Sequence, residues 1–172
     1  MSAQEEVEEH VHHARDRFEK LVAGNMAIVA ALLAIVSVLG QHYNTEELLK
    51  QQESSDQWAY YQAKGIRLYV AQSTQDLMAG GKTDTKALSR YQKDAARYAH
   101  EQSGIQEKAR ELERERDTSG RKARQFHLGE VFLEVAIVFL SLAILTRRRP
   151  LAFGGLASAV IGVVWATNAF FL

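Results

Sequence analysis

Three ionisable side chains lie inside a long apolar stretch of the sequence. His127, Glu130 and Glu134 are separated by three and four residues, so on a helix they share one face. Charged groups in lipid are costly and usually face protein or water, often along a path for ions or protons. Three interpretations fit: proton or ion transfer through a glutamate, a divalent metal held by imidazole and carboxylate, or headgroup-level residues with only Glu134 immersed and hydrogen-bonded to a neighbouring helix.

A second set of possible metal ligands lies near the N-terminus. Residues 1–20 form a charged tail rich in glutamate and histidine. Imidazole and carboxylate groups at one-turn spacing suit zinc, nickel or copper. The candidate ligands are Glu9, His10, His12 and His13. The alternative is a solvated charged face on a helical extension, and no other cofactor is expected.

Three apolar blocks must position these groups, and we expect each to be a transmembrane helix. They occupy residues 21–40, 127–146 and 151–172. About 20 residues rise about 30 Å as a helix, which matches the thickness of a hydrocarbon core. Backbone amides in lipid need partners within their own segment, so the blocks must be helical. The first block is long for a signal-peptide core and follows a glutamate-rich segment, so we interpret it as a retained anchor.

Residues 41–126 are polar, and a glycine-rich turn near residues 79–84 divides them into two arms of similar length. Such matched arms predict an antiparallel helical hairpin. Heptad spacing on the second arm selects Leu88, Tyr91, Ala95, Tyr98, Gln102, Ile105, Ala109 and Leu112, and continues through Arg116, Ser119, Ala123, Phe126, Glu130, Leu133, Ile137, Leu140 and Ile144. On the first arm it selects Ala59, Ala63, Ile66, Val70, Ser73 and Leu77. The predicted fold is therefore all-α: an integral membrane protein with three transmembrane helices and a long antiparallel coiled-coil hairpin between the first two.

Two places could interrupt the arms. Asn44 and Glu47 have the spacing of a capping box, and Thr118, Ser119 and Gly120 form a weak point on the other arm. A hinge at this height is one interpretation. The unbroken heptad phase favours the other, a continuous helix through both places.

Polar and small residues predict how the spans pack. Small side chains every four residues let helix backbones approach closely in lipid. In the third block these are Gly154, Ser158, Gly162 and Ala166. They would contact either the other spans or another subunit. Asn25 and Ser141 are expected at a similar depth, where they would hydrogen-bond across the first two spans.

Basic residues near the spans predict the orientation in the membrane. Arg15, Arg17 and Lys20 precede the first span, and residues 147–149, all arginine, fill the turn between the second and third. Both clusters are cytoplasmic if the N-terminus is cytoplasmic, which puts the hairpin and the C-terminus outside. Residues 121–124 oppose this assignment, but long loops follow the rule weakly. The arginine turn is also placed to contact anionic lipid headgroups.

An aromatic motif of unknown role lies in the first arm. It contains Asp56, Trp58, Tyr60 and Tyr61, and its interpretations are packing between hairpins or binding of a partner. The surrounding run, residues 55–66, resembles a bacterial family of small membrane proteins catalogued as domain of unknown function 4337. The similarity extends over the whole chain, from the tail to the two closing spans. It implies a bacterial inner-membrane location and no catalytic residues.

Composition removes several classes of function. The chain has no cysteine and a net charge of zero, which excludes thiol chemistry and argues against nucleic-acid binding. It shows no nucleophile–base set or phosphate loop, so an enzyme is not expected. The leading hypothesis is a non-enzymatic homo-oligomeric scaffold or assembly protein whose partners are the lipid bilayer and its own copies. The alternatives are a small ion- or proton-conducting channel or transporter, which would use Glu134, and a metal-responsive sensor, which would use the tail.

Overall fold

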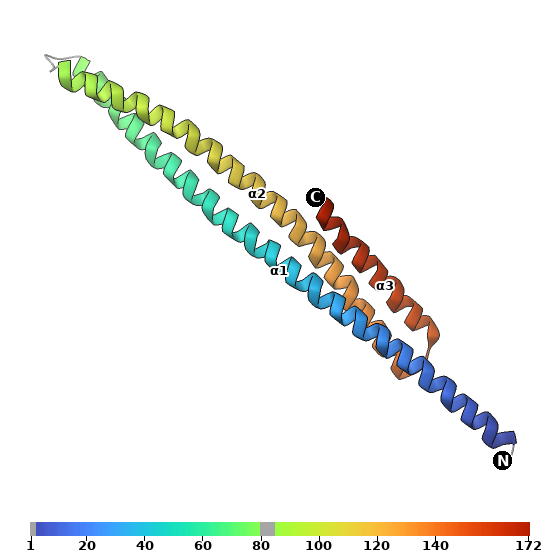
Figure 1. The fold of residues 1–172 in the computed structure, drawn as a ribbon. Helices are drawn as coiled ribbons and strands as arrows, with labels where there is room; N and C mark the ends of the chain where they lie inside the picture. The colour runs from blue at the N-terminus through green and yellow to red at the C-terminus, as the bar shows by residue number, and fades with distance from the viewer. Residues whose placement is uncertain (1–2, 80–84) are drawn as a thin grey trace. The chain divides into compact units, whose positions relative to one another are not determined.

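The computed structural model describes the backbone of residues 3–79 and 85–172, and the side chains from Arg17 onward within those ranges. Helix α1 runs from Ala3 to Ala79, α2 from Thr85 to Thr146 and α3 from Arg149 to Asn168, followed by the short 3-10 helix η1, Ala169–Phe171 (Figure 1). The described residues contain no strand, so the all-α prediction is confirmed. The expected turn at residues 80–84 lies outside the described residues.

The break between α2 and α3 has a local cause. Pro150 is the only proline in the chain, and it occupies the first turn of α3, where its missing N–H removes no helical hydrogen bond. Arg147 has a φ of 55°, in the left-handed region that ends helices. The chain therefore leaves α2 and enters α3 within two residues.

The chain divides into two compact units. Unit 1 comprises Met1–Asn44 and Gly120–Leu172, and unit 2 comprises Thr45–Ser119. The division falls at the two places where the sequence suggested a hinge. Both α1 and α2 are helical through these places, which confirms the continuous-helix interpretation.

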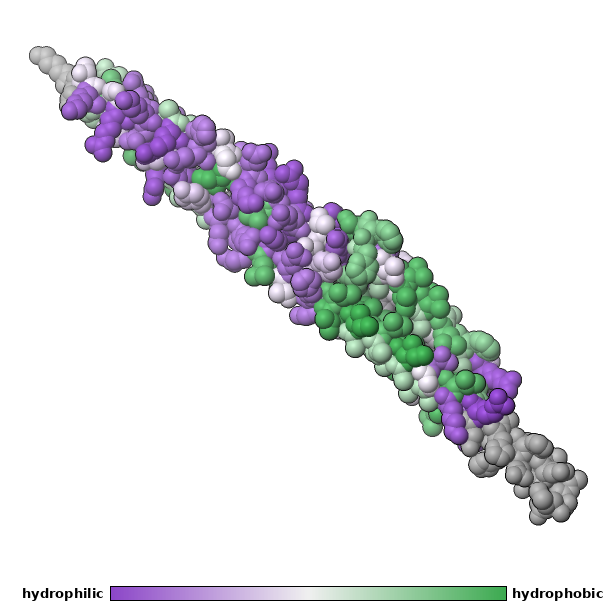
Figure 2. Space-filling view, viewed as in Figure 1, coloured by the Kyte–Doolittle hydropathy of each residue, from purple (hydrophilic) through white to green (hydrophobic). Residues whose placement is uncertain are grey.

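Unit 1 is a three-helix arrangement with a core of small and branched side chains. Its visible face is mostly hydrophobic (Figure 2), and each of its three helices has a stretch long and apolar enough to cross a membrane. The core residues are Val22, Val29 and Val36 of α1, Phe126, Leu133, Ala136, Leu140 and Ala143 of α2, and Ala152, Ala159 and Ala166 of α3. Small α3 residues bring that helix close to its neighbours.

Unit 2 is an antiparallel pair of helical arms whose visible face is mostly hydrophilic (Figure 2). Lys50 pairs with Glu115, whereas Lys64, further along α1, pairs with Glu101, earlier on α2. Every α2 position that heptad spacing selected, from Leu88 to Ile144, is buried or half-buried. The register predicted for α2 is therefore confirmed.

The register predicted for the first arm is wrong. Of the six α1 residues selected, only Ser73 is half-buried; the other five are exposed. We call this set, Ala59, Ala63, Ile66, Val70, Ser73 and Leu77, the outer stripe. The side of α1 that faces α2, the inner seam, consists of Ser54, Gln57, Tyr61, Lys64, Leu68, Ala71, Gln75 and Met78. The inner seam is less apolar than the outer stripe. Its polar residues can nevertheless lie against α2 because groups such as Lys64 and Gln75 are paired with that helix.

Candidate functional site

The structure brings together two of the three ionisable residues of the second apolar block. His127 Nδ1 lies 3.1 Å from Glu130 Oε2. Ser37 of α1 lies near the Glu130 carboxylate. Glu130 is half-buried, so it belongs to the contact between α1 and α2, as its heptad position predicted. Sequence reasoning assigned no role to Ser37, because a single serine in an apolar span is common.

Glu134 lies apart from this pair. It is exposed on the surface of unit 1, as are His127 and Ser141, and the three follow one another at seven-residue spacing along α2. Within the described part of the chain, no group of three or more His, Cys, Asp or Glu side chains is placed to hold a metal ion. A metal at this position would therefore need ligands from outside this chain's described residues.

The expected hydrogen bond between Asn25 and Ser141 does not form. Asn25 Nδ2 instead donates to the carbonyl oxygen of Leu21 on its own helix, at 3.0 Å. Ser141 is exposed. The sequence predicted that the two residues lie at a similar depth, but it did not predict which side of each helix they occupy. Asn25 bonds within α1 and does not reach Ser141.

The small residues of α3 pack mainly against α2 of the same chain. Ser158 Oγ donates to the carbonyl oxygen of Phe132 at 2.7 Å, and Gly162 and Ala166 are buried. A Cβ added at Gly162 would come within 2.8 Å of the Gly129 carbonyl oxygen, so the two backbones touch there. These three residues therefore contact the chain's own spans.

Gly154 is a correction to the predicted ladder. It is exposed, and a Cβ added there would meet nothing within 4 Å. Gly155 takes its place, because its added Cβ would lie 3.0 Å from the carbonyl oxygen of Ala136. A strict four-residue repeat misses this shift, because a helix has 3.6 residues per turn.

An ion pair joins the two basic clusters of unit 1. Arg147 Nε lies 3.1 Å from Glu19 Oε1, so the start of the first apolar block and the α2–α3 turn lie at the same end. A hollow of about 500 Å³ opens nearby between α1 and α3. Its lining consists of Arg17, Phe18, Leu21, Val22, Arg149, Ala152, Phe153 and Leu156. Two guanidinium groups beside apolar side chains have the chemistry that recognises an anionic amphiphile.

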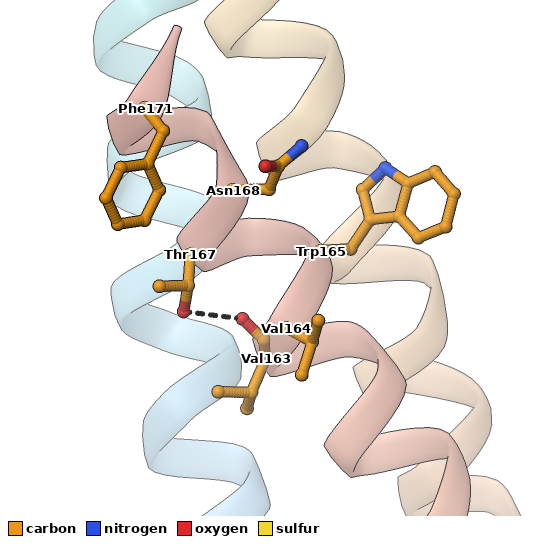
Figure 3. Close-up of a pocket in the computed structure, with 6 residues that line it drawn as sticks. All are labelled: Val163, Val164, Trp165, Thr167, Asn168 and Phe171. Carbon is orange, nitrogen blue, oxygen red and sulfur yellow. Dashed lines mark hydrogen bonds between the residues drawn. The ribbon is translucent and has the colours of Figure 1, made fainter.

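A second hollow, of about 440 Å³, lies on α3 near its C-terminal end (Figure 3). In this view Trp165 and Phe171 extend to opposite sides of the helix, and Asn168 lies between them (Figure 3). The Thr167 hydroxyl donates to the Val163 carbonyl of its own helix at 2.7 Å. Its lining residues contain no ionisable side chain, so it offers no acid–base or ionic chemistry.

Only part of the aromatic motif of unit 2 lies between the two arms of the hairpin. Trp58 Nε1 donates to Glu113 Oε1 of α2 at 2.8 Å, and its ring meets Tyr61 edge-on, with centroids 5.5 Å apart. Tyr60 and Asp56 are exposed. Trp58 therefore links the two arms and Tyr61 packs against its ring, roles that sequence reasoning had not assigned to them.

Among the residues of unit 2 that the structure describes, Lys64 is the most buried ionisable one, at 8% exposed. Its ammonium group forms an ion pair with Glu101 of α2 and lies 5.3 and 5.4 Å from the ring centroids of Tyr60 and Tyr98. The hydrogen bond from Lys64 lowers the pKa of Glu101 and the same bond raises the pKa of Lys64. Next to it, a Cβ added at Gly65 would lie 2.8 Å from Gln102 Nε2, so the arms approach closely.

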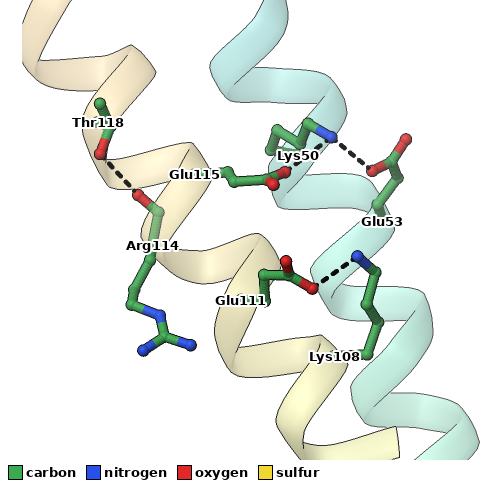
Figure 4. Close-up of polar contacts among 7 residues, drawn as sticks. All are labelled: Lys50, Glu53, Lys108, Glu111, Arg114, Glu115 and Thr118. Carbon is green, nitrogen blue, oxygen red and sulfur yellow. Dashed lines mark hydrogen bonds and ion pairs between the residues drawn. The ribbon is translucent and has the colours of Figure 1, made fainter.

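Further ion pairs lie at more exposed positions of unit 2, and of these Lys50–Glu115 joins the two arms (Figure 4). Lys50 Nζ lies 2.9 Å from Glu115 Oε2 and 3.3 Å from Glu53 Oε2, and the Glu115 hydrogen bond is the main reason that the pKa of Lys50 is raised. Lys108 pairs with Glu111 of its own helix at 2.7 Å, which lowers the pKa of Glu111. Exposed pairs of this kind contribute little to stability.

A comparison with known families gives the chain its relatives. The model of the family described as Domain of unknown function (DUF4337) matches residues 18–172. The chain belongs to this family. The DUF4337 match covers all three apolar blocks and the hairpin, and the resemblance of residues 55–66 is thereby confirmed. Neither the curated proteins nor the solved structures contain a match.

The candidate metal ligands of the tail lie outside this matched region. The DUF4337 match begins at Phe18, whereas Glu9, His10, His12 and His13 precede it, and their side chains lie outside the described residues. The metal-sensor hypothesis therefore stays a prediction. The groups that the DUF4337 match does include are the His127–Glu130 pair, Glu134 and the packing residues of α3.

Proposed function

We propose that this DUF4337 chain is an integral protein of a bacterial inner membrane that acts as a non-enzymatic homo-oligomeric scaffold. Three helices long and apolar enough to cross a membrane support the membrane location. In this proposal α1 and α2 form a coiled-coil hairpin outside the bilayer. The N-terminus is cytoplasmic, which places the arginine turn on the cytoplasmic side and the hairpin and C-terminus on the other.

The exposure of Glu134 is the observation that supports a homo-oligomer. The residue is exposed on unit 1 in the middle of a stretch that would lie in lipid. Membrane carboxylates that face lipid are rare because they are costly, and most pair with protein groups. A second copy of the chain would cover Glu134 together with Ser141, which is exposed on the same side of α2. Exposed small residues on α1, including Ala23, Ala27, Ala30 and Ala34, would let a neighbouring helix approach closely.

The experiment is native mass spectrometry of the chain released from lipid nanodiscs. The wild type is expected as two or more copies, and a single-copy mass would overturn the proposal. Glu134→Gln keeps a hydrogen-bonding side chain and should keep the oligomer. Glu134→Leu removes the hydrogen bond that we propose between Glu134 and the second copy. A loss of about 1–2 kcal/mol corresponds to about 5- to 30-fold weaker association.

The second candidate function, an ion or proton channel, is favoured by the same glutamate if it faces a lumen between copies. His127 and Glu130 would then lie one to two turns further along the path. Proton flux into liposomes carrying a pH-sensitive dye tests this function. Flux in the wild type that Glu134→Gln abolishes would favour the channel over the scaffold.

A further inference from the structure

The outer stripe is an apolar face on an arm that is otherwise polar. Its largest members are strongly exposed, with Ile66 at 66%, Val70 at 55% and Leu77 at 82%. Relative to the inner seam, the stripe lies on the opposite side of α1. Scattered exposed apolar residues are ordinary, but a row of apolar residues on one helix face, interrupted here only by Ser73, is typical of an interaction surface.

The outward face of the α2 arm provides an internal comparison. The α2 residues that face away from α1 are Arg90, Lys93, Arg97, His100, Gly104, Glu107, Glu111 and Arg114, and all are exposed. None of them is a large apolar residue. The outer face of α2 is therefore built for water, whereas the outer face of α1 is not.

The spacing of the outer stripe identifies the kind of partner. Its members alternate four and three residues apart from Ala59 to Leu77. An apolar repeat that averages 3.5 residues lets two helices supercoil with their apolar rows in continuous contact. A flat surface or a strand would meet only part of such a row. The partner is therefore another helix.

We propose that the outer stripe binds the outer stripe of a second copy of this chain. The inference rests on the proposed membrane anchoring, because copies inserted in one membrane share an orientation and their first arms run parallel. A two-fold axis then brings each stripe residue against its own counterpart. Ile66 meets Ile66, and Val70 meets Val70.

The residues beside the stripe are compatible with this parallel pairing. In a parallel coiled coil, the residue just before the first core position of each heptad, here Ala63 or Val70, faces the residue five positions later on the other helix. This sets Gln62 against Arg67 of the second copy and Tyr69 against Thr74 of the second copy. Neither pair joins like charges. The next core position below Ala59 is Asp56, which would meet its own copy, so the contact ends there.

Cysteine cross-linking in native membranes tests the pairing. The chain has no cysteine, so single substitutions are unambiguous. Ile66→Cys and Val70→Cys are expected to form oxidised dimers, and the matched control Ser103→Cys lies on the outward side of α2. A disulfide needs Cα atoms within about 7 Å, so we expect about tenfold more dimer at the stripe positions than at the control. Equal yields at the three positions would overturn the proposal.

A second measurement separates this proposal from the proposed function. Ile66→Glu with Val70→Glu places like charges on the stripe without touching the inner seam, so helix content by circular dichroism should be unchanged. Native mass spectrometry should then show fewer copies than in the wild type. A wild-type oligomer that this double variant leaves intact would refute the stripe interface and spare the scaffold. A monomeric wild type would refute both the stripe interface and the homo-oligomeric scaffold. The same holds if the wild type is a monomer and the Ile66→Cys variant cross-links only to a different protein.

Discussion

Lys64 of α1 forms an ion pair with Glu101 of α2 while its ammonium group lies between the rings of Tyr60 and Tyr98. A buried lysine at a core heptad position costs stability but specifies register. Any slip of one arm along the other would separate the lysine from its carboxylate. The pair therefore holds unit 2 in one alignment.

The stability of the hairpin should depend on pH at both extremes because of this pair. Glu101 has a lowered pKa in the folded chain, so its contribution is present above the unfolded value of about 4.3 and is lost as pH falls through the folded pKa. Lys64 has a raised pKa, so its contribution is present below the unfolded value of about 10.4 and is lost as pH rises through the folded pKa. Arg97, 3.8 Å from Glu101, also stabilises the carboxylate and stays charged throughout.

Thermal unfolding followed by circular dichroism from below about pH 4 to above about pH 10.5 measures both limbs of this dependence, the loss of stability in acid and the loss in base. Lys64→Met with Glu101→Gln should flatten both limbs. Lys108→Met, which breaks an exposed pair within α2, is the matched control and should change them much less. Limbs that persist unchanged in the Lys64 double variant would show that other groups cause them.

The first arm shows why apolarity alone misplaced the seam. α1 carries two heptad rows, and the outer stripe, with Ile66, Val70 and Leu77, is the more apolar. The inner seam is buried through specific pairing instead: Lys64 with Glu101, and Gln75 Nε2 donating to the Tyr91 carbonyl oxygen at 2.9 Å. Such pairs depend on two arms at once, so one arm's sequence cannot rank them. The register of the α2 arm could be predicted because residues 85–119 carry only one row of large apolar side chains, whereas the α1 arm carries two.

The candidate site was predictable to a similar extent. Heptad phase placed Glu130 at the α1–α2 contact, and its histidine partner followed from the three-residue spacing. The exposure of Glu134 was not predictable, because α3 covers one side of α2 and the sequence does not say which. The shift from Gly154 to Gly155 has the same origin.

A methyl group at Gly162 should weaken the packing of α3. Its Cβ would lie 2.8 Å from the Gly129 carbonyl oxygen, and backbone atoms move only at a cost, so Gly162→Ala should destabilise by about 1–3 kcal/mol. Thermal unfolding in mild detergent, followed by circular dichroism, measures the change. Gly154→Ala is the matched control and should be nearly neutral, because its Cβ meets open space. Equal effects would mean that α3 packs differently.

The arginine-lined hollow in unit 1 should retain anionic lipid. Arg17→Gln and Arg149→Gln each remove one of its guanidinium groups, and we expect fewer anionic lipids bound in native mass spectra. Arg148→Gln removes the same charge from the same turn, but Arg148 does not line the hollow, so it should retain more lipid. If all three variants lose lipid equally, net charge and not the hollow determines binding.

The hydrogen bond from the Ser158 hydroxyl to the Phe132 carbonyl oxygen should stabilise the α2–α3 contact. A hydroxyl that bonds only within its own helix should not. Ser158 Oγ donates across the helices at 2.7 Å, and such bonds in membranes contribute about 0.6 kcal/mol on average. Ser158→Ala should therefore lower the free energy of unfolding in lipid micelles by about this amount. Thr167→Ala removes a hydroxyl that bonds only within α3, so it tests whether the loss comes from the contact between helices. A larger effect at Thr167 than at Ser158 would contradict the assignment of Ser158 to that contact.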